Sequence, residues 1–253
     1  MIHVERYGTG TRAYAALHGW GGSHRTYAPL APYVPESAAL YAIDLPGYGL
    51  TPRTTAASAA EIGGIIAAAL APLPSPPLTL VGNCSGAIFA LLAASAPGSP
   101  VTRLVLIDPF AFVPWYFKVF INPTYGRYAY YSTFANPLGR WVTNASLRRR
   151  RAATSNLTGS FRHVDHEVSL QYLSLLDAVG SIEAFRGVGV PTEIAYGERT
   201  FGAVRASLAG WSEVLPQTRL WKIARAGHLP IEEAPAQIAA IVFGDTASAG
   251  RVR

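Results

Sequence analysis

One short segment around residue 84 constrains the fold more than any other part of the chain. Leu78–Val81 reads as a short buried strand, and Ser85–Ala96 is an alanine- and leucine-rich helical candidate. Between them, Gly82 and Gly86 stand two positions either side of Cys84. Small residues at this spacing permit a sharp turn from strand to helix that pushes the central side chain outward. The segment therefore predicts a strand, a tight turn and a helix in direct succession.

The rest of the chain repeats this alternation of strand and helix. Further strands are expected at 14–17, 39–43, 104–107, 192–196 and 218–223, and further helices at 59–73, 201–215 and 231–243. Such alternation favours a mostly parallel sheet covered by helices on both faces. The pattern breaks after Asp108 into an aromatic stretch that runs to about Ala184.

Composition limits the class of protein. The chain has 253 residues and is 50% apolar, enough for one α/β domain with a sizeable core. Its single cysteine precludes an internal disulfide, and Met1–Arg6 lacks the pattern of a secretory signal. No uninterrupted apolar run approaches the roughly 20 residues that cross a bilayer. We therefore expect a soluble, cytoplasmic protein without a membrane span.

Positive charge is concentrated in one middle segment. The net charge is +6, and residues 110–164 contain eight of the 21 basic residues and no Asp or Glu. The remaining 13 basic residues are outweighed by all 15 acidic ones, so the main fold is close to neutral. No nucleic-acid recognition motif accompanies the arginines, and we expect no nucleic-acid partner. The segment instead reads as a separate functional insertion.

Four motifs in fixed order carry a family resemblance. They are His18–Gly22, Asp44–Gly49, the elbow at Gly82–Gly86, and Gly227–Pro230. Together they resemble the α/β-hydrolase superfamily over residues 10–108 and 186–243. The resemblance implies a hydrolase core at 1–109 and 186–244 and a cap, or lid, at 110–185. Residues 245–253, small and charged, are expected to be a disordered tail.

The resemblance also implies roles for particular residues. Cys84 stands at the nucleophile position and His228 at that of the general base, with backbone N–H groups of Trp20 and Ser85 as oxyanion donors. Ser85 itself is disfavoured as nucleophile because a one-residue shift turns its side chain away from the elbow tip. Asp44–Gly49 reads as a structural turn whose carboxylate satisfies backbone donors, and His18 as a prop for the glycine-rich loop. No cofactor and no metal are expected.

The identity of the acid that would orient His228 stays open. The family commonly shows Gly-Glu-x-Asp after the strand ending at Tyr196, whereas this chain reads Gly197-Glu198-Arg199-Thr200. Haloalkane dehalogenases place the acid after an earlier strand, and Asp108 occupies the matching position. Asp108 is the favoured candidate, Glu198 the next, and a Cys84/His228 dyad without an acid the third.

A thiol at the elbow changes the expected chemistry. Thiolate is a better nucleophile than a neutral hydroxyl, but it leaves more readily than alkoxide, so its adduct with an ordinary ester tends to collapse backwards. Activated acyl donors such as thioesters are therefore favoured.

The insertion reads as a substrate cap. Twelve aromatic residues lie between Phe110 and Trp141, as a small core of the lid or as the wall of an apolar pocket. We expect Trp115, Tyr116, Tyr128 and Phe134 to contact substrate. The run Arg148–Arg151 is either a solvated face or a site for an anion, such as coenzyme A or an acidic carrier protein.

The leading hypothesis is an acyl-transfer enzyme, a thioesterase, acyltransferase or cyclase, acting on a fatty-acyl or polyketide-like thioester through an acyl-cysteine intermediate. One alternative is a lactone or ester hydrolase, since dienelactone hydrolases resemble this chain in using Cys and His at the same fold positions. Another is a hydrolase-fold lyase, isomerase or binding protein without acyl transfer, which the missing aspartate at Thr200 favours. The sequence leaves the oligomeric state open.

Overall fold

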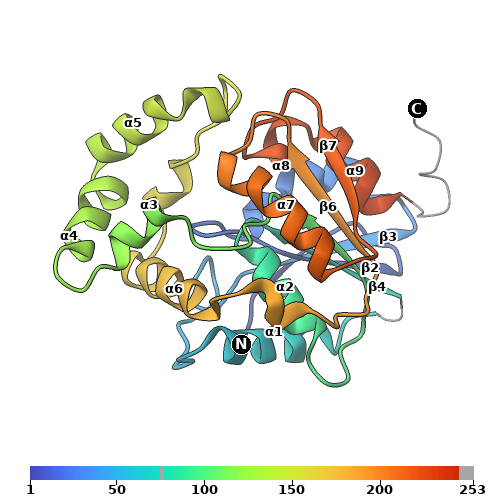
Figure 1. Cartoon of the computed structure of the whole chain (residues 1–253). Coiled ribbons are helices and arrows are strands. Elements are labelled where there is room, and N and C mark those ends of the chain that lie inside the picture. The colour runs from blue at the N-terminus through green and yellow to red at the C-terminus, as the bar shows by residue number, and fades with distance from the viewer. Residues whose placement is uncertain (75–76, 245–253) are drawn as a thin grey trace.

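A computed structural model describes residues 1–74 and 77–244. Its core is a seven-stranded sheet in the order β1-β3-β2-β4-β5-β6-β7 (Figure 1). β1 is antiparallel to β3, and the other neighbouring pairs are parallel. The strands are β1 (Val4–Tyr7), β2 (Arg12–Leu17), β3 (Ala38–Ile43), β4 (Leu78–Asn83), β5 (Val101–Ile107), β6 (Thr192–Gly197) and β7 (Arg219–Ile223). The predicted parallel α/β sheet is confirmed.

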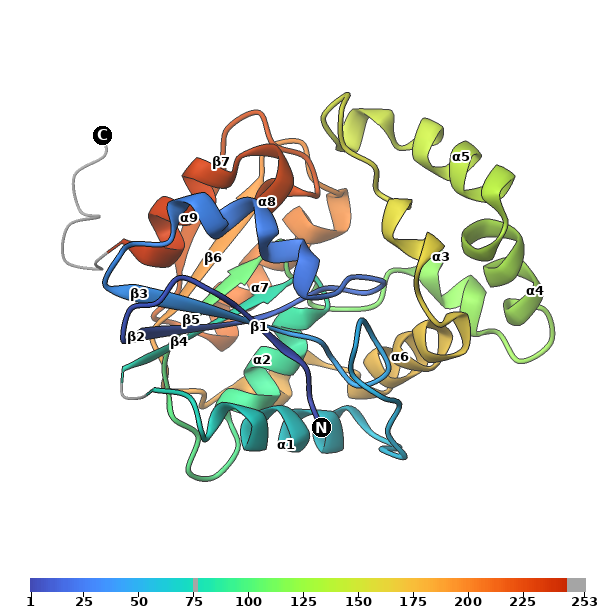
Figure 2. The same ribbon diagram turned by 180° about the vertical axis from the view of Figure 1, so that it is seen from behind.

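Side chains alternate along the strands, and both faces of the five inner strands β3, β2, β4, β5 and β6 are largely buried. Ala13, Ala15 and Leu17 of β2 face one apolar cluster, while Tyr14 and Ala16 face another. The first cluster includes residues of α1 (Ala59–Leu70), α2 (Gly86–Ala94) and α7 (Gly202–Val214). The second includes residues of the 3-10 segment η1 (His24–Tyr33), α8 (Pro230–Glu233) and α9 (Pro235–Phe243). Figures 1 and 2 show these two layers of helices on opposite sides of the strands.

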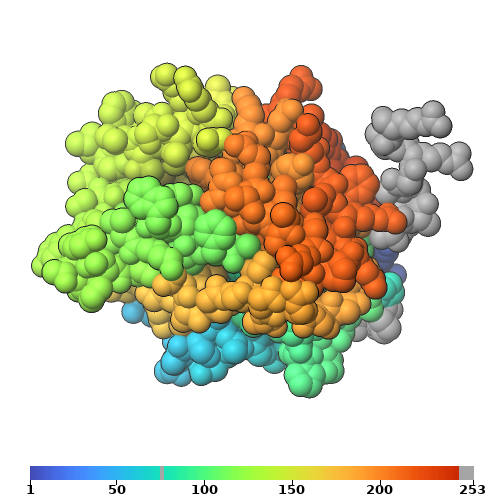
Figure 3. Space-filling view, in the orientation of Figure 1, coloured from blue at the N-terminus to red at the C-terminus, as the bar shows by residue number. Residues whose placement is uncertain are grey.

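The segment between β5 and β6 forms a group of helices at one end of the sheet. It contains α3 (Trp115–Lys118), α4 (Gly126–Tyr130), a π-helical turn (Tyr131–Ala135), α5 (Pro137–Ser146), α6 (His166–Val179) and the short 3-10 turns η2 (Val119–Ile121), η4 (Arg148–Arg150), η5 (Gly159–Arg162) and η6 (Ile182–Phe185). In the space-filling view its residues, green to gold, cover one side of the molecule and meet the orange C-terminal part (Figure 3). The cap predicted at residues 110–185 falls within this segment, and its role as a lid stays a prediction.

Several elements differ from the sequence prediction. β1 and η1 were not predicted, because four residues at a sheet edge and a proline-containing turn give weak periodic patterns. The helix expected at 231–243 is two helices, since Pro235 starts a new one after Ala234. The tail predicted at 245–253 lies outside the described residues. Among the helices of residues 1–74 and 77–244, none has the length and apolar character that a bilayer span requires.

Candidate active site

The backbone at Cys84 is strained in the way the elbow motif predicts. Cys84 has φ +53°, an uncommon value for a residue with a side chain. Glycine is required on both sides, because a Cβ at Gly82 would lie 2.6 Å from Ala87 Cα and one at Gly86 would lie 2.5 Å from the His18 carbonyl oxygen. The tight turn therefore presents the Cys84 side chain between β4 and α2.

The loop after β2 packs directly against this turn. A Cβ at Gly19 would lie 2.9 Å from the Cβ of Cys84, so only glycine allows this approach. His18 is fully buried; its Nδ1–H donates to the Gly19 carbonyl at 2.8 Å, and its Nε2 accepts from the Leu45 amide at 3.1 Å. These bonds confirm that His18 props the loop and bring Trp20 beside Cys84.

Trp20 is held by the inserted segment. Its indole N–H donates to the Ser169 carbonyl at 2.6 Å. The rings of Phe117, Phe134 and Phe161 pack edge-on against it at centroid distances of 5.4, 5.0 and 4.8 Å. The aromatic residues of the insertion thus form a small core that includes Trp20, and they fix the loop that follows β2.

Asp108 lies against His228, 120 residues apart in sequence. His228 Nδ1–H donates to Asp108 Oδ2 at 2.8 Å. The same carboxylate accepts the Thr200 hydroxyl at 2.5 Å and the Gly197 amide at 2.9 Å. Asp108 is fully buried and has φ +50°. Of the acids considered from sequence, the structure therefore brings Asp108 to the histidine.

Glu198 points elsewhere. Its carboxylate accepts the Arg225 amide at 2.9 Å and lies 3.8 Å from the Lys222 ammonium, at the exposed surface. Thr200, the residue found where the family commonly has aspartate, acts as a donor to Asp108. The sequence marked this position as a departure from the family pattern but contained no signal for the hydrogen bond, which depends on the adjacent ends of the parallel strands β5 and β6.

The electrostatics of His228 reflect its two neighbours. Burial lowers its pKa, but the charge of Cys84, followed by the hydrogen bond to Asp108, outweighs burial and raises the pKa to about 10. The rings of Phe110 and Phe201 pack against the imidazole at 5.5 and 4.6 Å. Phe201 was not singled out from sequence, although it follows directly on Gly197–Thr200. Both neighbours therefore stabilise the protonated form of the ring.

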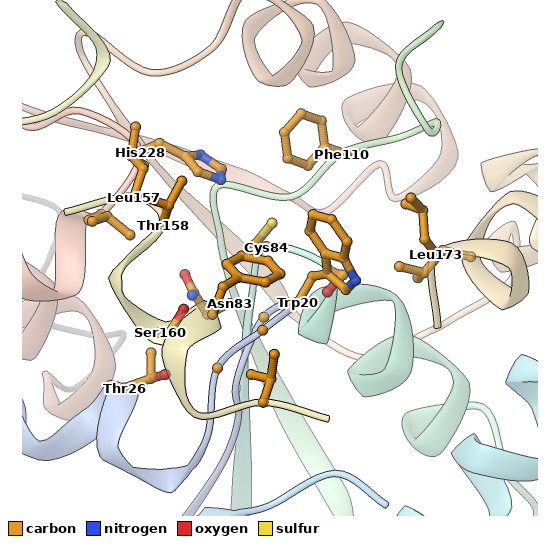
Figure 4. Close-up of a pocket in the computed structure, with 18 of the residues that line it drawn as sticks. Trp20, Thr26, Asn83, Cys84, Phe110, Leu157, Thr158, Ser160, Leu173 and His228 are labelled. Carbon is orange, nitrogen blue, oxygen red and sulfur yellow. The ribbon is translucent and has the colours of Figure 1, made fainter. Parts of the chain in front are cut away.

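A cavity of about 830 Å³ opens over Cys84. In Figure 4 the sulfur points into it between the rings of His228 and Trp20. The hydroxyl residues Thr26, Thr158 and Ser160 lie on one side of the sulfur, and the apolar Phe110 and Leu173 on the other. Ser85 is in the cavity lining and immediately precedes α2, whose dipole favours an anion at this end of the helix.

The four residues predicted to contact substrate do not lie together. Phe134 is in the cavity wall. Tyr116 is partly buried and near Cys84, whose charge, after burial, raises the pKa of the phenol. Trp115 and Tyr128 face solvent outside the wall, 77% and 76% exposed, because the first turns of α3 and α4 direct them outward. This placement corrects the expectation that all four line the pocket.

The arginine run also divides. Arg150 donates to the Thr200 carbonyl at 3.1 Å, and Arg151 donates to the Ala152 and Ser155 carbonyls at 2.8 and 2.7 Å. Arg148 and Arg149 are exposed. Half of the run is thus structural, and the other half is accessible to an anion.

Comparison with known proteins agrees with this architecture. A family model described as alpha/beta hydrolase fold matches residues 16–235. Pimeloyl-[acyl-carrier protein] methyl ester esterase of Xylella fastidiosa (strain M12) is 27% identical over 245 residues, covering 90% of this chain and 91% of that protein. The protein of the same name in Legionella pneumophila (strain Corby) is 39% identical over 51 residues, so the match spans 21% of its length and 20% of this chain.

Solved structures show the same fold at low identity. The enol-lactonase from Burkholderia xenovorans LB400 matches with a TM-score of 0.75 and 15% identity, over 96% of this chain and 95% of that one. The bromoperoxidase from Bacillus anthracis matches with a TM-score of 0.74 and 14% identity, over 96% and 94%. At these identities the likeness concerns the fold alone.

Proposed function

Because the chain belongs to the α/β hydrolase fold family, we propose that it hydrolyses carboxylic esters through a covalent intermediate on Cys84. The observation that carries this proposal is the placement of Cys84 and His228 in the lining of one large, mostly apolar cavity, with His228 hydrogen-bonded to Asp108. The charge of Cys84 acts on the pKa of His228, so the two side chains are close to each other, which favours catalysis over the binding-protein hypothesis.

In the first half-reaction the sulfur attacks the ester carbonyl. The attacking sulfur is the thiolate, which is the nucleophilic form of a cysteine. The carbonyl oxygen gains negative charge in the tetrahedral intermediate, and backbone N–H groups of Trp20 and Ser85 would stabilise it. The C–O bond then breaks as His228 Nε2–H gives its proton to the departing alcohol oxygen. An acyl-Cys84 thioester and a neutral imidazole result.

The raised pKa of His228 explains how a cysteine could cleave an ordinary oxygen ester. An unassisted alkoxide leaves less readily than a thiolate, so the intermediate would revert. An imidazolium present before attack delivers its proton as the C–O bond breaks, which makes the alcohol the better leaving group. Asp108 stabilises the positive ring while this proton is held.

Water completes the cycle. Neutral His228 Nε2 removes a proton from a water molecule, whose oxygen attacks the thioester carbonyl. The second intermediate collapses with loss of the Cys84 thiolate and releases the carboxylic acid. His228 then keeps the proton it took from water, and the ion pair is restored. One ester and one water give one acid and one alcohol.

The proposed substrate is a methyl or similarly small ester of an acyl chain held on a carrier protein. The names of the Xylella and Legionella relatives support this class and the ester-hydrolase alternative over acyl transfer. The cavity offers apolar wall for the chain, and the exposed Arg148 and Arg149 offer positive charge to an acidic carrier.

Thioester cleavage or acyl transfer is the second candidate, and the thiol itself favours it. A thioester has a leaving group matched to Cys84, so exchange between the two sulfurs needs less acid assistance. The two candidates differ in which bond of a carrier-bound acyl methyl ester is broken: the methyl ester at the distal end, or the thioester to the carrier.

Mass spectrometry of one substrate distinguishes them. Incubated with a dicarboxylic monomethyl ester on an acyl carrier protein, the enzyme should release methanol and leave the acyl chain on the carrier. Release of the chain from an intact methyl ester would instead establish the thioesterase. The Cys84→Ala variant should lose at least about 10³-fold in kcat/KM, and an adduct trapped on the wild type should map to Cys84. Undiminished turnover by Cys84→Ala would disprove both candidates.

A further inference from the structure

Two histidines and a glutamate from separate parts of the chain gather beside β1. One ligand atom each of His3, Glu5 and His24 lies within 4.8 Å of the other two. None of them belongs to the series Asp108, His228 and Cys84, and His3 and His24 stand in no sequence motif. The grouping arises because β1 pairs with β3 and η1 follows β2 on the same side of the sheet.

His3 and Glu5 are held on one face of the edge strand. They are two residues apart, so their side chains point the same way. The backbone of His3 is fixed on both sides: its N–H donates to Thr51 Oγ1 at 2.9 Å, and its carbonyl accepts the Asp44 amide at 3.1 Å. The position of the imidazole is thus set by the sheet edge.

Asp44 orients His24. The carboxylate accepts the His24 backbone amide at 2.6 Å and its ring Nδ1–H at 2.8 Å. Asp44 is fully buried, and the His24 side chain is 11% exposed. A carboxylate on Nδ1 leaves Nε2 as the nitrogen with a lone pair, the arrangement that commonly supports a metal-bound histidine. The rings of His24 and His3 lie 4.9 Å apart.

The buried position of His3 Nε2 points to a ligand at this site. This atom is shielded from solvent and lacks a hydrogen-bond partner among the described residues. Glu5 Oε2 lies 3.8 Å from His3 Nε2, which is too far for a hydrogen bond. Buried polar atoms of this kind are costly unless a partner satisfies them. A cation between the nitrogen and the oxygen would bond to both.

We propose that His3, Glu5 and His24 bind a divalent transition metal of the zinc class, with Asp44 as the outer carboxylate. Two imidazole nitrogens and one carboxylate oxygen match the donor preference of Zn²⁺, whereas Mg²⁺ and Ca²⁺ prefer oxygen. The metal joins β1 to the start of η1, directly after the glycine-rich loop that carries Trp20. Its role is to brace that loop.

Isothermal titration of tag-free protein with Zn²⁺ tests the site. The parent should be the Cys84→Ser variant, because the thiol and His228 form a second potential zinc ligand pair. We expect one Zn²⁺ per chain, and at least about tenfold weaker binding in His3→Gln and Glu5→Gln. Glu36→Gln and His163→Gln, exposed residues outside the cluster, are the matched controls and should bind like the parent.

Thermal unfolding gives a second readout independent of activity. At a hundredfold excess over the parent's Kd, Zn²⁺ should raise the Tm of the parent by about 5–10 °C and that of Glu5→Gln by about half as much or less, while Mg²⁺ should have no effect on either. Failure of the parent to bind Zn²⁺, parental affinity in Glu5→Gln, or equal weakening in His163→Gln would each overturn the proposal. Since Glu5 is at the surface, its variant should fold normally.

Discussion

At the scale of single residues, the acid beside His228 shows what the sequence could and could not decide. The motif order predicted Cys84 and His228 as partners, but three hypotheses for the acid stayed open. Asp108, Glu198 and Thr200 each follow a strand, and which side chain reaches the imidazole depends on positive φ at Asp108 and on the register of β5 with β6. Neither can be read from one sequence.

Asp108→Asn tests this assignment. The amide cannot stabilise the imidazolium and can hold the ring in the wrong tautomer, so kcat/KM for ester hydrolysis should fall by about 10²-fold or more. Glu198→Gln is the matched control and should keep near-parental kcat/KM, because its carboxylate bonds only to surface groups in the described contacts. A larger loss in Glu198→Gln than in Asp108→Asn would reverse the assignment.

The protonation of His228 depends on Cys84. Among the influences that raise its pKa, the charge of Cys84 is the largest, and burial opposes it. Cys84→Ala should therefore lower the His228 pKa from about 10, and the ring should lose its proton at lower pH than in the wild type. An NMR titration of the His228 ring measures this directly. An unchanged titration curve in Cys84→Ala would show that the sulfur and the ring do not interact.

At the scale of elements, the inserted segment is connected to the loop that carries His228. The His228 amide donates to the Arg150 carbonyl at 2.8 Å, and Glu233 of α8 accepts the Ala152 amide and the Ser155 hydroxyl at 2.8 and 2.7 Å. Glu233 also accepts the Gly227 amide. One carboxylate thus joins the insertion, the His228 loop and α8. The sequence showed an arginine run but not these contacts, which span about 80 residues.

Glu233→Ala should loosen this connection. Three buried or half-buried donors lose their acceptor, and each lost hydrogen bond lowers the free energy of unfolding by up to about 3 kcal/mol. We therefore expect a lower Tm, and a lower kcat with a smaller change in KM. Steady-state kinetics and thermal unfolding measure both. Glu213→Ala, an exposed glutamate paired only loosely with Arg186 at 3.6 Å, should match the parent. Equal behaviour of the two variants would contradict the proposed connection.

At the scale of the whole molecule, the sheet and its helices were predictable because their patterns are local. Apolar strands and alanine-rich helices alternate with clear periods, and the four motifs fixed their order. The antiparallel edge strand β1 was not predictable, because its pairing with β3 links residues about 40 positions apart and leaves no period in four residues. The grouping of His3 with His24 follows from that same pairing and was missed with it.

The global stability of the molecule should depend on pH through His18. Burial, only partly offset by the hydrogen bond to Gly19 and the charge of Asp44, lowers its pKa to about 4. Between about pH 6.5 and 4 the unfolded chain therefore binds a proton at His18 that the folded chain does not bind. Stability is fully present above this window and decreases as the pH falls through it.

His18→Gln keeps an acceptor for Leu45 and a donor for Gly19 but cannot ionise. From pH 7 to 4.5 its free energy of unfolding in urea should decrease by roughly 2–3 kcal/mol less than that of the wild type. His163→Gln removes an exposed histidine, and its free energy of unfolding should decrease over this pH range by as much as that of the wild type. If the free energy of unfolding of His18→Gln also decreases by the wild-type amount, the buried ring of His18 is not the group that titrates.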